Sequence, residues 1–577
     1  MSGLLVGQNH NVALHEPGRQ TRRLSGERSF ANAGPDFGAG IGCAHDGFRL
    51  VSFELSCIVR VNHKLKKGGS MPHFSTFAEQ TPDRPAYIMA NSGQVVTYGE
   101  LDRRSNQIAH LLRLSGVQRG DHIAMMMKNC PEFLQVAQAA NRAGCIFTPI
   151  STHLKKEETA YIITNCKAKL FIASAELAQV ATEAAAASKG LSHCLSVGGE
   201  IAGFEALSEK LIDLPDTPIA DEYLGSPMLY SSGTTGKPKG VYWAPHAESI
   251  HTDHPLAGSV GAFFGFGVDT VYLSPAPLYH AAPLHYNLMV LGLGGTSLIM
   301  EHFDPEQSLQ LIERYKATHS QWVPIMFVRM LKLSEEVRTR YDLSSMTCAI
   351  HAAAPCPIDV KEAMIDWWGP VIVEYYSGSE GNGFTIIDSA TWLSHKGSVG
   401  QAIIGEPRIL GENGEVLGPG EVGDVYFANS RPFEYFDEPE KTREAFNAQG
   451  WSTMGDVGYL DEEGFLYLTD RKNFTIITGG VNVYPAEIEG LLISHNKVAD
   501  VAVFGIPDPE YGESVQAVVQ PVNWADATDQ TAIELMEWLR ERLSSVKVPK
   551  SIDFLEQLPR MDNGKLYKRH LMEAYRQ

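Results

Sequence analysis

Hydrophobic and polar residues follow two different periods along the chain, and these periods predict helices and strands in turn. Residues 97–100 have the Thr-x-x-Glu spacing of a helix capping box, and residues 101–112 then place leucine and isoleucine on one helical face. Another helix is predicted to begin at Pro305. Short apolar runs such as residues 144–147 separate helices of this kind. This alternation from about Met71 onward is typical of layered α/β domains with largely parallel sheets.

The pattern changes after the strand-like residues 465–468. The polar segment 469–473 that follows is a candidate linker between domains. From Pro485 to residue 543 the chain predicts two helices and two strands, enough for a small α+β domain of roughly 100 residues. We therefore expect a large N-terminal domain over residues 71–469 and a small C-terminal domain over residues 470–577.

The first seventy residues differ from the rest of the chain. They contain glycine, asparagine, arginine and serine without sustained periodicity, and no apolar core of a signal peptide follows a basic start. We expect residues 1–70 to be a disordered extension or one foreign to the native protein, with folding starting near Met71. An appended regulatory segment is the alternative.

Charge and cysteine content exclude several classes of protein. The chain has 48 Lys+Arg against 68 Asp+Glu, a net charge of −20, which repels nucleic acids. Its eight cysteines include no Cys-x-x-Cys pair, which is typical of reduced thiols and not of a disulfide framework or a zinc site. The apolar run 288–300 is interrupted by glycines and is too short to span a bilayer. We therefore expect a cytoplasmic protein with no nucleic-acid partner and no transmembrane segment.

The most informative segment is the Ser/Thr/Gly-rich stretch at residues 231–240. Its glycines let the backbone turn sharply, and its hydroxyls and amides can donate to phosphate oxygens, while Lys239 adds a positive charge. Composition alone would favour a flexible linker. The segment is not the P-loop of ATPases, because Ser231 stands where the first glycine is required and Pro238 where a magnesium-binding hydroxyl is required.

Residues 230–240 resemble the phosphate-binding loop of the adenylate-forming superfamily, which includes acyl-CoA synthetases, luciferases and the adenylation domains of peptide synthetases. Further segments resemble the same family in its own order: residues 277–280, 352–355, 376–380, 451–458, 470–489 and 559–565. The resemblance covers the chain from about Thr76 to its end. It implies an α/β fold with a large N-terminal domain of layered sheets and a small β-barrel part. A small mobile C-terminal α+β domain is implied to carry the catalytic lysine.

Three positions depart from the family pattern. Ser379 stands where threonine is usual, which retains the hydroxyl. Met454 stands where threonine often precedes Gly-Asp, as it can in acyl-CoA members. Asn473 falls where the hinge residue is usually aspartate or lysine. The Asn473 departure is therefore expected to affect the energetics of the hinge and not the chemistry.

The resemblance implies an acid–CoA ligase that uses ATP and Mg²⁺ and forms an acyl-adenylate. It assigns Lys565 to the acyl carboxylate and the α-phosphate, Ser379 to the α-phosphate and Glu380 to Mg²⁺, while Asp456 and Arg471 hold the ribose. The other residues that it assigns to the nucleotide or to coenzyme A are Ser231, Ser232, Gly233, Thr234, Thr235, Lys239, Ala353, Ala354, Pro355, Glu374, Tyr375, Tyr376, Gly479 and Gly480.

The acid itself is less well specified. His280, Trp322 and Gly378 are expected to line the acyl site, and no cationic residue in the expected walls invites a dicarboxylate. An apolar acid of the fatty, steroid-side-chain or aryl class is therefore expected, and a homodimer is a possible assembly. The alternative is an adenylation enzyme that delivers its acyl group to a separate carrier protein. An inactive adenylate-binding regulator is disfavoured because Lys239, Glu380, Asp456, Arg471 and Lys565 are all present.

Overall fold

The computed structural model describes residues 71–231, 237–243, 249–251, 255–430, 432–560 and 566–575. Several predictions fall outside these residues: the extension at residues 1–70, four members of the phosphate-binding segment (Ser232, Gly233, Thr234 and Thr235) and the catalytic Lys565. No helix in the described part of the chain is both long and apolar enough to cross a membrane.

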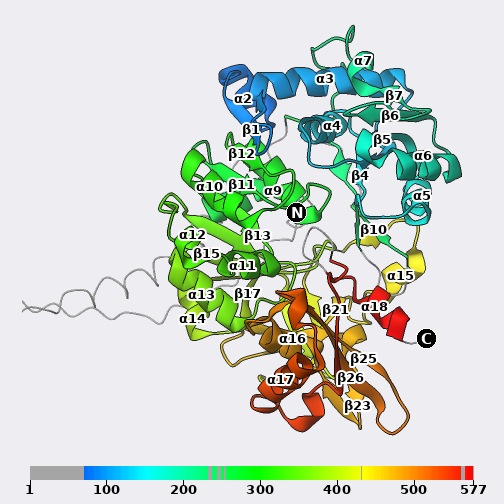
Figure 1. Ribbon diagram of the computed structural model, residues 1–577. Coiled ribbons are helices and arrows are strands. Elements are labelled where there is room, and N and C mark those ends of the chain that lie inside the picture. Colours follow the sequence, from blue (N-terminus) through cyan, green and yellow to red (C-terminus); the bar gives the residue numbers. More distant parts are fainter. Residues whose placement is uncertain are drawn as a thin grey trace, which may run out of the picture.

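A six-stranded parallel sheet forms one layer of the large N-terminal part, in the order β7-β6-β5-β3-β4-β8 (Figure 1). Every residue of β3 is buried, as expected for a parallel strand covered on both faces. The strands are β3 (His122–Met126), β4 (Ile146–Pro149), β5 (Ala168–Ser174), β6 (His193–Val197), β7 (Glu205–Ala206) and β8 (Ser226–Pro227). The helices around this sheet are α2 (Ser75–Gln80), α3 (Tyr98–Leu114), α4 (Pro131–Arg142), α5 (Lys156–Asn165), α6 (Ala178–Ala187) and α7 (Leu207–Lys210).

A thirteen-stranded sheet forms the second layer, in the order β18-β19-β21-β22-β17-β16-β15-β14-β13-β11-β12-β1-β2. The run from β15 to β1 is parallel, whereas β16 to β22 extend it with antiparallel strands at the place of the expected β-barrel part. Its strands are β1 (Pro85–Met89), β2 (Val95–Thr97), β11 (Val271–Ser274), β12 (Thr296–Ile299), β13 (His319–Trp322), β14 (Cys348–His351), β15 (Ile372–Tyr376), β16 (Phe384–Asp388), β17 (Ser398–Ile404), β18 (Glu406–Leu410), β19 (Gly423–Ala428), β21 (Ser452–Leu460) and β22 (Leu466–Arg471).

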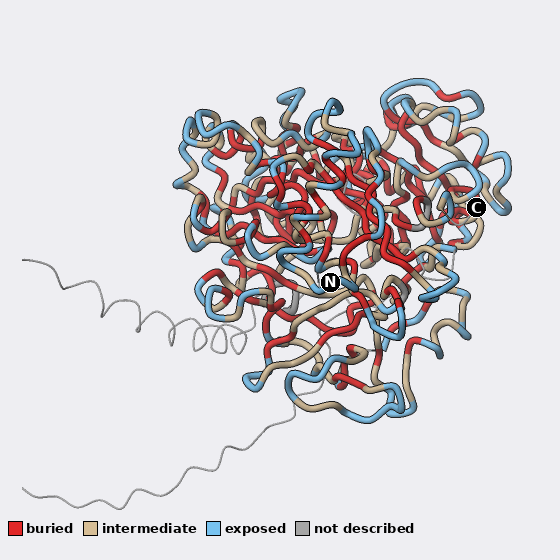
Figure 2. Tube along the Cα trace, turned by 60° about the horizontal axis from the view of Figure 1, so that its bottom comes forward, coloured by how far each residue is buried: buried red, intermediate tan, exposed pale blue. Residues whose placement is uncertain are grey.

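Helices of both layers begin where the sequence predicts. The side chain of Thr97 accepts a hydrogen bond from the amide of Glu100 at the start of α3, and Asp304 accepts one from Gln307 before Pro305 opens α10. The remaining helices of this part are α8 (Pro255–Phe264), α9 (Ala281–Gly292), α10 (Pro305–Tyr315), α11 (Pro324–Leu331), α12 (Glu335–Arg338), α13 (Ile358–Trp368), α14 (Ser389–Ser394) and α15 (Pro439–Glu444). Buried residues lie in the interior of the molecule, with exposed residues mostly in loops at its periphery (Figure 2).

Two smaller sheets complete the fold. Strands β9 (Leu229–Ser231), β10 (Lys239–Tyr242) and β20 (Glu434–Tyr435) form an antiparallel sheet in the order β20-β10-β9. The C-terminal sheet runs β24-β23-β26-β25, and β27 pairs with β26. Its elements are β23 (Ile476–Thr478), β24 (Val481–Val483), α16 (Pro485–Ile493), β25 (Val498–Asp508), β26 (Gly512–Pro521), α17 (Asp529–Arg540), β27 (Ser551–Phe554) and α18 (Lys568–Tyr575). The fold is therefore mixed α/β with a large N-terminal and a small C-terminal part, as predicted.

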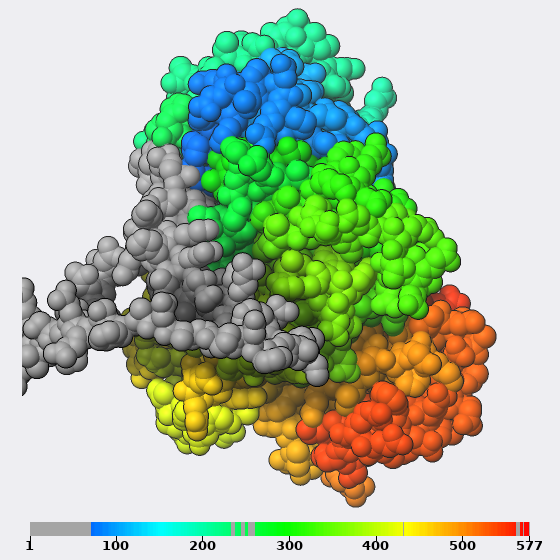
Figure 3. All heavy atoms as spheres, turned by 90° about the vertical axis from the view of Figure 1, so that its left-hand side faces the viewer, coloured from blue at the N-terminus to red at the C-terminus, as the bar shows by residue number. Residues whose placement is uncertain are grey.

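The small part rests against the large one (Figure 3). The ammonium group of Lys332, at the end of α11, donates to the carbonyl oxygen of Val498 in β25. The carboxylate of Asp470, in β22, accepts a hydrogen bond from the amide of Ala486 in the first turn of α16 at 3.0 Å. Because β22 pairs with β21 as far as Arg471, the last residues of this strand belong to the large sheet.

Candidate active site

Tyr376, Asp456 and Arg471 form the first group of candidate residues, which we call the Asp456 cluster. Asp456 and Arg471 stand opposite each other on the antiparallel strands β21 and β22, so their side chains share one face. The guanidinium Nε of Arg471 lies 3.1 Å from Asp456 Oδ1, and the Tyr376 hydroxyl donates to Oδ2 at 2.6 Å. Burial, followed by the charge of Asp456, raises the pKa of Tyr376, so its hydroxyl stays protonated. Both carboxylate oxygens of Asp456 therefore have a fixed partner.

Ser231, Lys239, Glu380 and Tyr435 form the second group, which we call the Glu380 cluster. Ser231 and Lys239 are cross-strand neighbours on β9 and β10. The hydroxyls of Ser231 and Tyr435 both donate to Glu380 Oε1, at 3.4 and 3.1 Å. The Nζ of Lys239 lies 4.5 Å from the centre of the Tyr435 ring, and burial lowers the pKa of this lysine. The structure therefore brings the flanks of the phosphate-binding segment to the predicted magnesium ligand.

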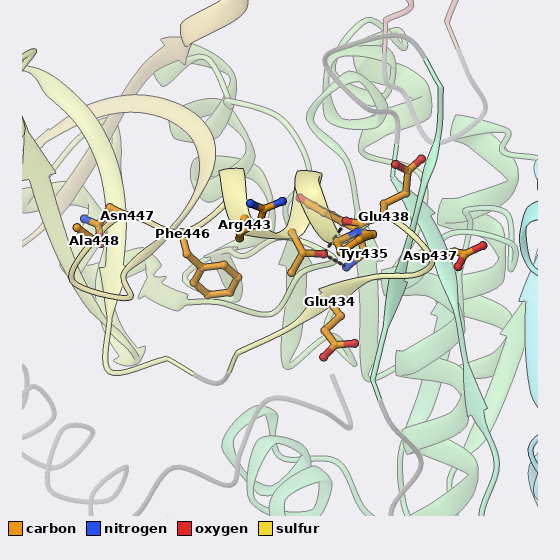
Figure 4. Close-up of a pocket in the computed structure, with 10 residues that line it drawn as sticks. Glu434, Tyr435, Asp437, Glu438, Arg443, Phe446, Asn447 and Ala448 are labelled. Carbon is orange, nitrogen blue, oxygen red and sulfur yellow. Dashed lines mark hydrogen bonds between the residues drawn. The ribbon is translucent and has the colours of Figure 1, made fainter.

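Tyr435 is the member of the Glu380 cluster that the sequence did not reveal. It lies in a two-residue strand within a polar segment, where no spacing distinguishes it from a surface aromatic. A hollow of about 670 Å³ lies beside it (Figure 4). The hollow is lined by Glu434, Tyr435, Asp437, Glu438, Pro439, Thr442, Arg443, Phe446, Asn447 and Ala448.

The loop after β15 links the two clusters. Tyr376 ends β15, Glu380 follows four residues later, and Ser379 is half-buried between them. A Cβ added to Gly378 would lie 2.1 Å from the sulfur of Met454, far closer than two such atoms approach. Gly378 therefore allows Met454, two residues before Asp456, to pack against this loop.

The segment expected to lie against adenine leaves β14 in a strained conformation. Ala353 has φ +79°, a left-handed value that alanine rarely adopts, and Ala354 and Pro355 are exposed beside it. Strain of this kind is often found where the backbone is shaped to receive a ligand. The three residues thus present an open surface at the end of β14.

Glu374 and Tyr375 point into the core instead. The Nζ of Lys361, on α13, lies 2.5 Å from Glu374 Oε2, and His351 Nε2 is 3.6 Å from the same oxygen. Burial raises the pKa of Glu374, opposed by Lys361, and burial together with Lys361 lowers the pKa of His351. Tyr375 stacks on Phe384 with ring centres 4.9 Å apart. The side chains of Glu374 and Tyr375 are therefore occupied within the protein, which leaves only their main chains for a nucleotide.

Trp322, expected to line the acyl site, is part of the core in this structure. It has no exposed surface, its Nε1 donates to Ser320 Oγ at 2.6 Å, and its ring packs edge-on against Trp368. It ends β13, whose four residues are all buried, and its assignment to the acyl site stays a prediction. His280 is half-buried before the first turn of α9, with its ring centre 4.4 Å from that of Tyr279.

Gly479 and Gly480 form the turn between β23 and β24 in the C-terminal part. Their φ angles are +58° and +79°, so both adopt the left-handed conformation that favours glycine. Both residues are exposed, and space is open around the position of a Gly480 Cβ. A bulky residue at Gly480 would therefore add volume at an open turn and not in a core.

Magnesium fits this arrangement through the substrate. The described residues contain no group of three or more His, Cys, Asp or Glu side chains that could hold a metal by themselves. Mg²⁺ commonly binds to proteins through one or two carboxylates together with the phosphates of a nucleotide. Glu380 is 8% exposed and is oriented by two hydroxyls, so one fixed carboxylate is available for that mode of binding.

Comparison with family models identifies the class of protein. Residues 74–433 match the model described as AMP-binding enzyme, and residues 487–565 match that of the AMP-binding enzyme C-terminal domain. The chain belongs to the AMP-binding enzyme family. Members of this family form adenylates, so this AMP-binding enzyme is an acid–thiol ligase by class, as its sequence motifs implied.

Relatives of this AMP-binding enzyme match over most of its length. A feruloyl-CoA synthase from an Amycolatopsis species is 33% identical over 496 residues, covering 84% of this chain and 94% of the relative. A long-chain-fatty-acid–CoA ligase of Mycobacterium tuberculosis is 31% identical over 512 residues, covering 86% and 97%. The crystal structure of ATP-bound MatB from Rhodopseudomonas palustris superposes with a TM-score of 0.69 at 27% identity, covering 87% of this chain and 99% of that structure.

Proposed function

We propose that this AMP-binding enzyme is an acid–CoA ligase that converts an apolar carboxylic acid, ATP and coenzyme A into acyl-CoA, AMP and pyrophosphate. The observation that carries the proposal is the junction of the two clusters at the end of β15. Tyr376 holds Asp456 on one side of the loop, and Glu380 meets Ser231 and Tyr435 on the other. A nucleotide that spans this junction would place its ribose at Asp456 and its phosphates at Glu380.

The first half-reaction forms a bond between a carboxylate oxygen and the α-phosphorus and breaks the bond to pyrophosphate. Negative charge builds on the phosphoryl oxygens and the leaving group, so fixed donors and cations supply most of the catalysis. Ser231 and Lys239, at the ends of the phosphate-binding segment, and Ser379 are placed to provide them. Mg²⁺ held by Glu380 would neutralise phosphate charge, and Lys565 would bridge the acid and the α-phosphate.

The second half-reaction forms the bond between the thiol sulfur and the acyl carbon and breaks the bond to AMP, with loss of the thiol proton. We assign the open turn of Gly479 and Gly480 to the pantetheine arm, because ligand can approach backbone closely where side chains are absent. This assignment requires the small C-terminal domain, predicted as residues 470–577, to turn against the large domain, predicted as residues 71–469. Because β22 stays paired as far as Arg471, we place the pivot at residues 472–474.

The proposed class of acid is supported by the charge of one residue expected near the site and by the names of the relatives. His351 is fully buried and its pKa is lowered, so it adds no positive charge at neutral pH. The two relatives described above are named for feruloyl and long-chain fatty acyl groups. Fatty or aryl acids are therefore the first candidates, with a steroid side-chain acid as the third. A separate carrier protein as the acyl acceptor remains the second candidate function.

Two assays test the proposal. ATP–pyrophosphate exchange with a panel of fatty, aryl and dicarboxylic acids should be fastest with an apolar acid, and the same activated acid offered to coenzyme A and to acyl carrier protein should react with coenzyme A. Exchange with no acid of the panel would refute the proposed chemistry, and transfer to the carrier alone would favour the second candidate.

Substitution of Lys565, which the family resemblance assigns to catalysis, tests whether this lysine acts in the first half-reaction only. Lys565→Ala should abolish acyl-AMP formation and leave thioester formation from supplied acyl-AMP largely intact. Lys547→Ala is a matched control, because Lys547 only forms a surface ion pair with Glu487, at 2.7 Å. Equal loss of both half-reactions in Lys565→Ala would contradict the role.

A further inference from the structure

Tyr435 connects three structural elements at the Glu380 cluster. It lies in β20, which pairs with β10 at Val241, two residues from Lys239. Its main-chain amide donates to the hydroxyl of Thr442 in α15 at 2.9 Å (Figure 4). Its ring packs edge-on against Phe433, with centres 5.3 Å apart. The side chain is therefore held by its strand, by α15 and by its aromatic neighbour before any ligand arrives.

The hydroxyl of Tyr435 determines how the Glu380 carboxylate lies. It donates to Oε1 at 3.1 Å, and the longer bond from Ser231, at 3.4 Å, reaches the same oxygen. The other oxygen, Oε2, lies on the side of Gly378, 3.0 Å from the position of an added Cβ. Two donors on one oxygen limit rotation of the carboxylate and leave Oε2 directed at the loop that joins the two clusters.

We infer that Tyr435 is a positioning residue for the metal-bound nucleotide: it orients Glu380 so that Oε2 can bind the Mg²⁺ that accompanies ATP. The inference rests on the proposed function, since it requires ATP to bind at this junction. Tyr435 acts through Glu380 and not on the phosphates directly. Its hydroxyl should therefore affect the binding of ATP with Mg²⁺ and leave the binding of metal-free ATP unchanged.

Tyr435→Phe separates the hydroxyl from the ring. Phenylalanine keeps the contacts with Lys239 and Phe433 but cannot donate to Glu380. We expect calorimetric titration of the full-length protein to show roughly tenfold weaker binding of ATP in the presence of Mg²⁺, because a hydrogen bond to a charged group is lost. Binding of ATP in EDTA should not change. Tyr242→Phe is the matched control, because Tyr242 lies on the neighbouring strand and packs on Phe436.

A double-substitution cycle tests whether the effect passes through Glu380. In a Glu380→Gln background, Tyr435→Phe should have no further effect on the ratio of the ATP affinity with Mg²⁺ to the ATP affinity in EDTA. The inference would be overturned if Tyr435→Phe lowered this ratio further in the Glu380→Gln background. It would also be overturned if Tyr435→Phe alone weakened the binding of ATP equally with and without Mg²⁺. If Tyr435→Phe fails to fold, Thr442→Val provides a second test, because it removes the acceptor of the Tyr435 amide. Thr442→Val should lower the same ratio by a smaller factor. An unchanged ratio would count against the inference.

The controls also separate this inference from the proposed function. If the wild-type protein binds no ATP with Mg²⁺, the proposed function itself fails. If the wild type prefers ATP with Mg²⁺ and Tyr435→Phe keeps the whole preference, the ligase proposal stands and only the role of Tyr435 is refuted.

Discussion

Glu374 and Glu380 lie six residues apart, on either side of the end of β15, yet their partners differ in kind. Glu374 is 4% exposed and forms an ion pair with Lys361, whose ammonium group neutralises it. Glu380 is nearly as buried, at 8%, but its described partners are the hydroxyls of Ser231 and Tyr435. Hydroxyl donors orient a carboxylate without forming an ion pair with it, although the ammonium group of Lys239 is close enough to interact with Glu380 electrostatically. Glu374 is thus tied into the core by an ion pair, whereas Glu380 is oriented by two hydroxyls beside the phosphate-binding segment.

The largest effect should come from breaking the buried pair. Lys361→Met leaves the Glu374 carboxylate buried and unpaired, and it should destabilise the protein by about 3–5 kcal/mol. The midpoint of chemical denaturation, followed by tryptophan fluorescence, measures this loss. The double variant Lys361→Met with Glu374→Leu should recover most of it, because no buried charge is left. If the single variant were as stable as the wild type, the distinction between the two glutamates would be lost.

Unlike Lys361→Met, Glu380→Gln should lower activity and leave stability almost unchanged. The amide retains the shape of the side chain and can still accept from Tyr435, so the denaturation midpoint should stay close to that of the wild type. The rate of ATP–pyrophosphate exchange should fall by about 10²-fold, because a fixed charge at the reacting phosphates is removed. A large loss of stability together with activity would show that Glu380, like Glu374, mainly supports the fold.

The loop between the two glutamates gives a smaller effect. Gly378→Ala places a methyl group against the sulfur of Met454 and should cost about 1–3 kcal/mol through overpacking. The thermal unfolding temperature and the affinity for ATP should both fall. Met454→Ala in the same chain should restore part of each, because it removes the atom that clashes. No rescue would mean that Gly378 is required by something other than Met454.

The smallest effect is expected at a surface pair near the same region. Lys472 lies 2.6 Å from Asp424 with its side chain 65% exposed, and Lys472→Ala should change stability by no more than about 1 kcal/mol. A thermal melt at low and high salt measures it. A larger change would indicate that Lys472 also restrains the segment where we place the pivot.

Much of the fold could be predicted from the sequence because local signals determine it. The cap at Thr97, the proline at the start of α10 and the strand–helix alternation of the C-terminal part are all present as expected. Asp456 and Arg471 were assigned through the resemblance of residues 451–458 and 470–489 to family motifs, and the structure places them opposite each other. The cap, the proline and each motif are contained in a short segment, so they can be recognised without knowledge of the fold.

The features that were missed depend on contacts between distant segments. Trp322 was expected to line the acyl site, and its complete burial depends on packing against Phe327 and against Trp368 of a later helix. Tyr435 was missed because its importance comes from Glu380, 55 residues earlier in the chain. Glu374 was predicted to bind the nucleotide, but its side chain pairs with Lys361, which lies on α13, the helix that precedes β15. Periodicity and spacing carry no information about such pairings.

The first helix of the C-terminal part is tied to the strand that carries Arg471. Asp470 accepts the amide of Ala486 in α16, and the next residue, Arg471, reaches Asp456. A rotation of the C-terminal part that pulled α16 away would release Asp470 and disturb β22 one residue from the group that grips Asp456. If Asp456 binds the ribose as proposed, movement of the small domain would also weaken that contact, and the nucleotide would be held most firmly while the two parts remain docked.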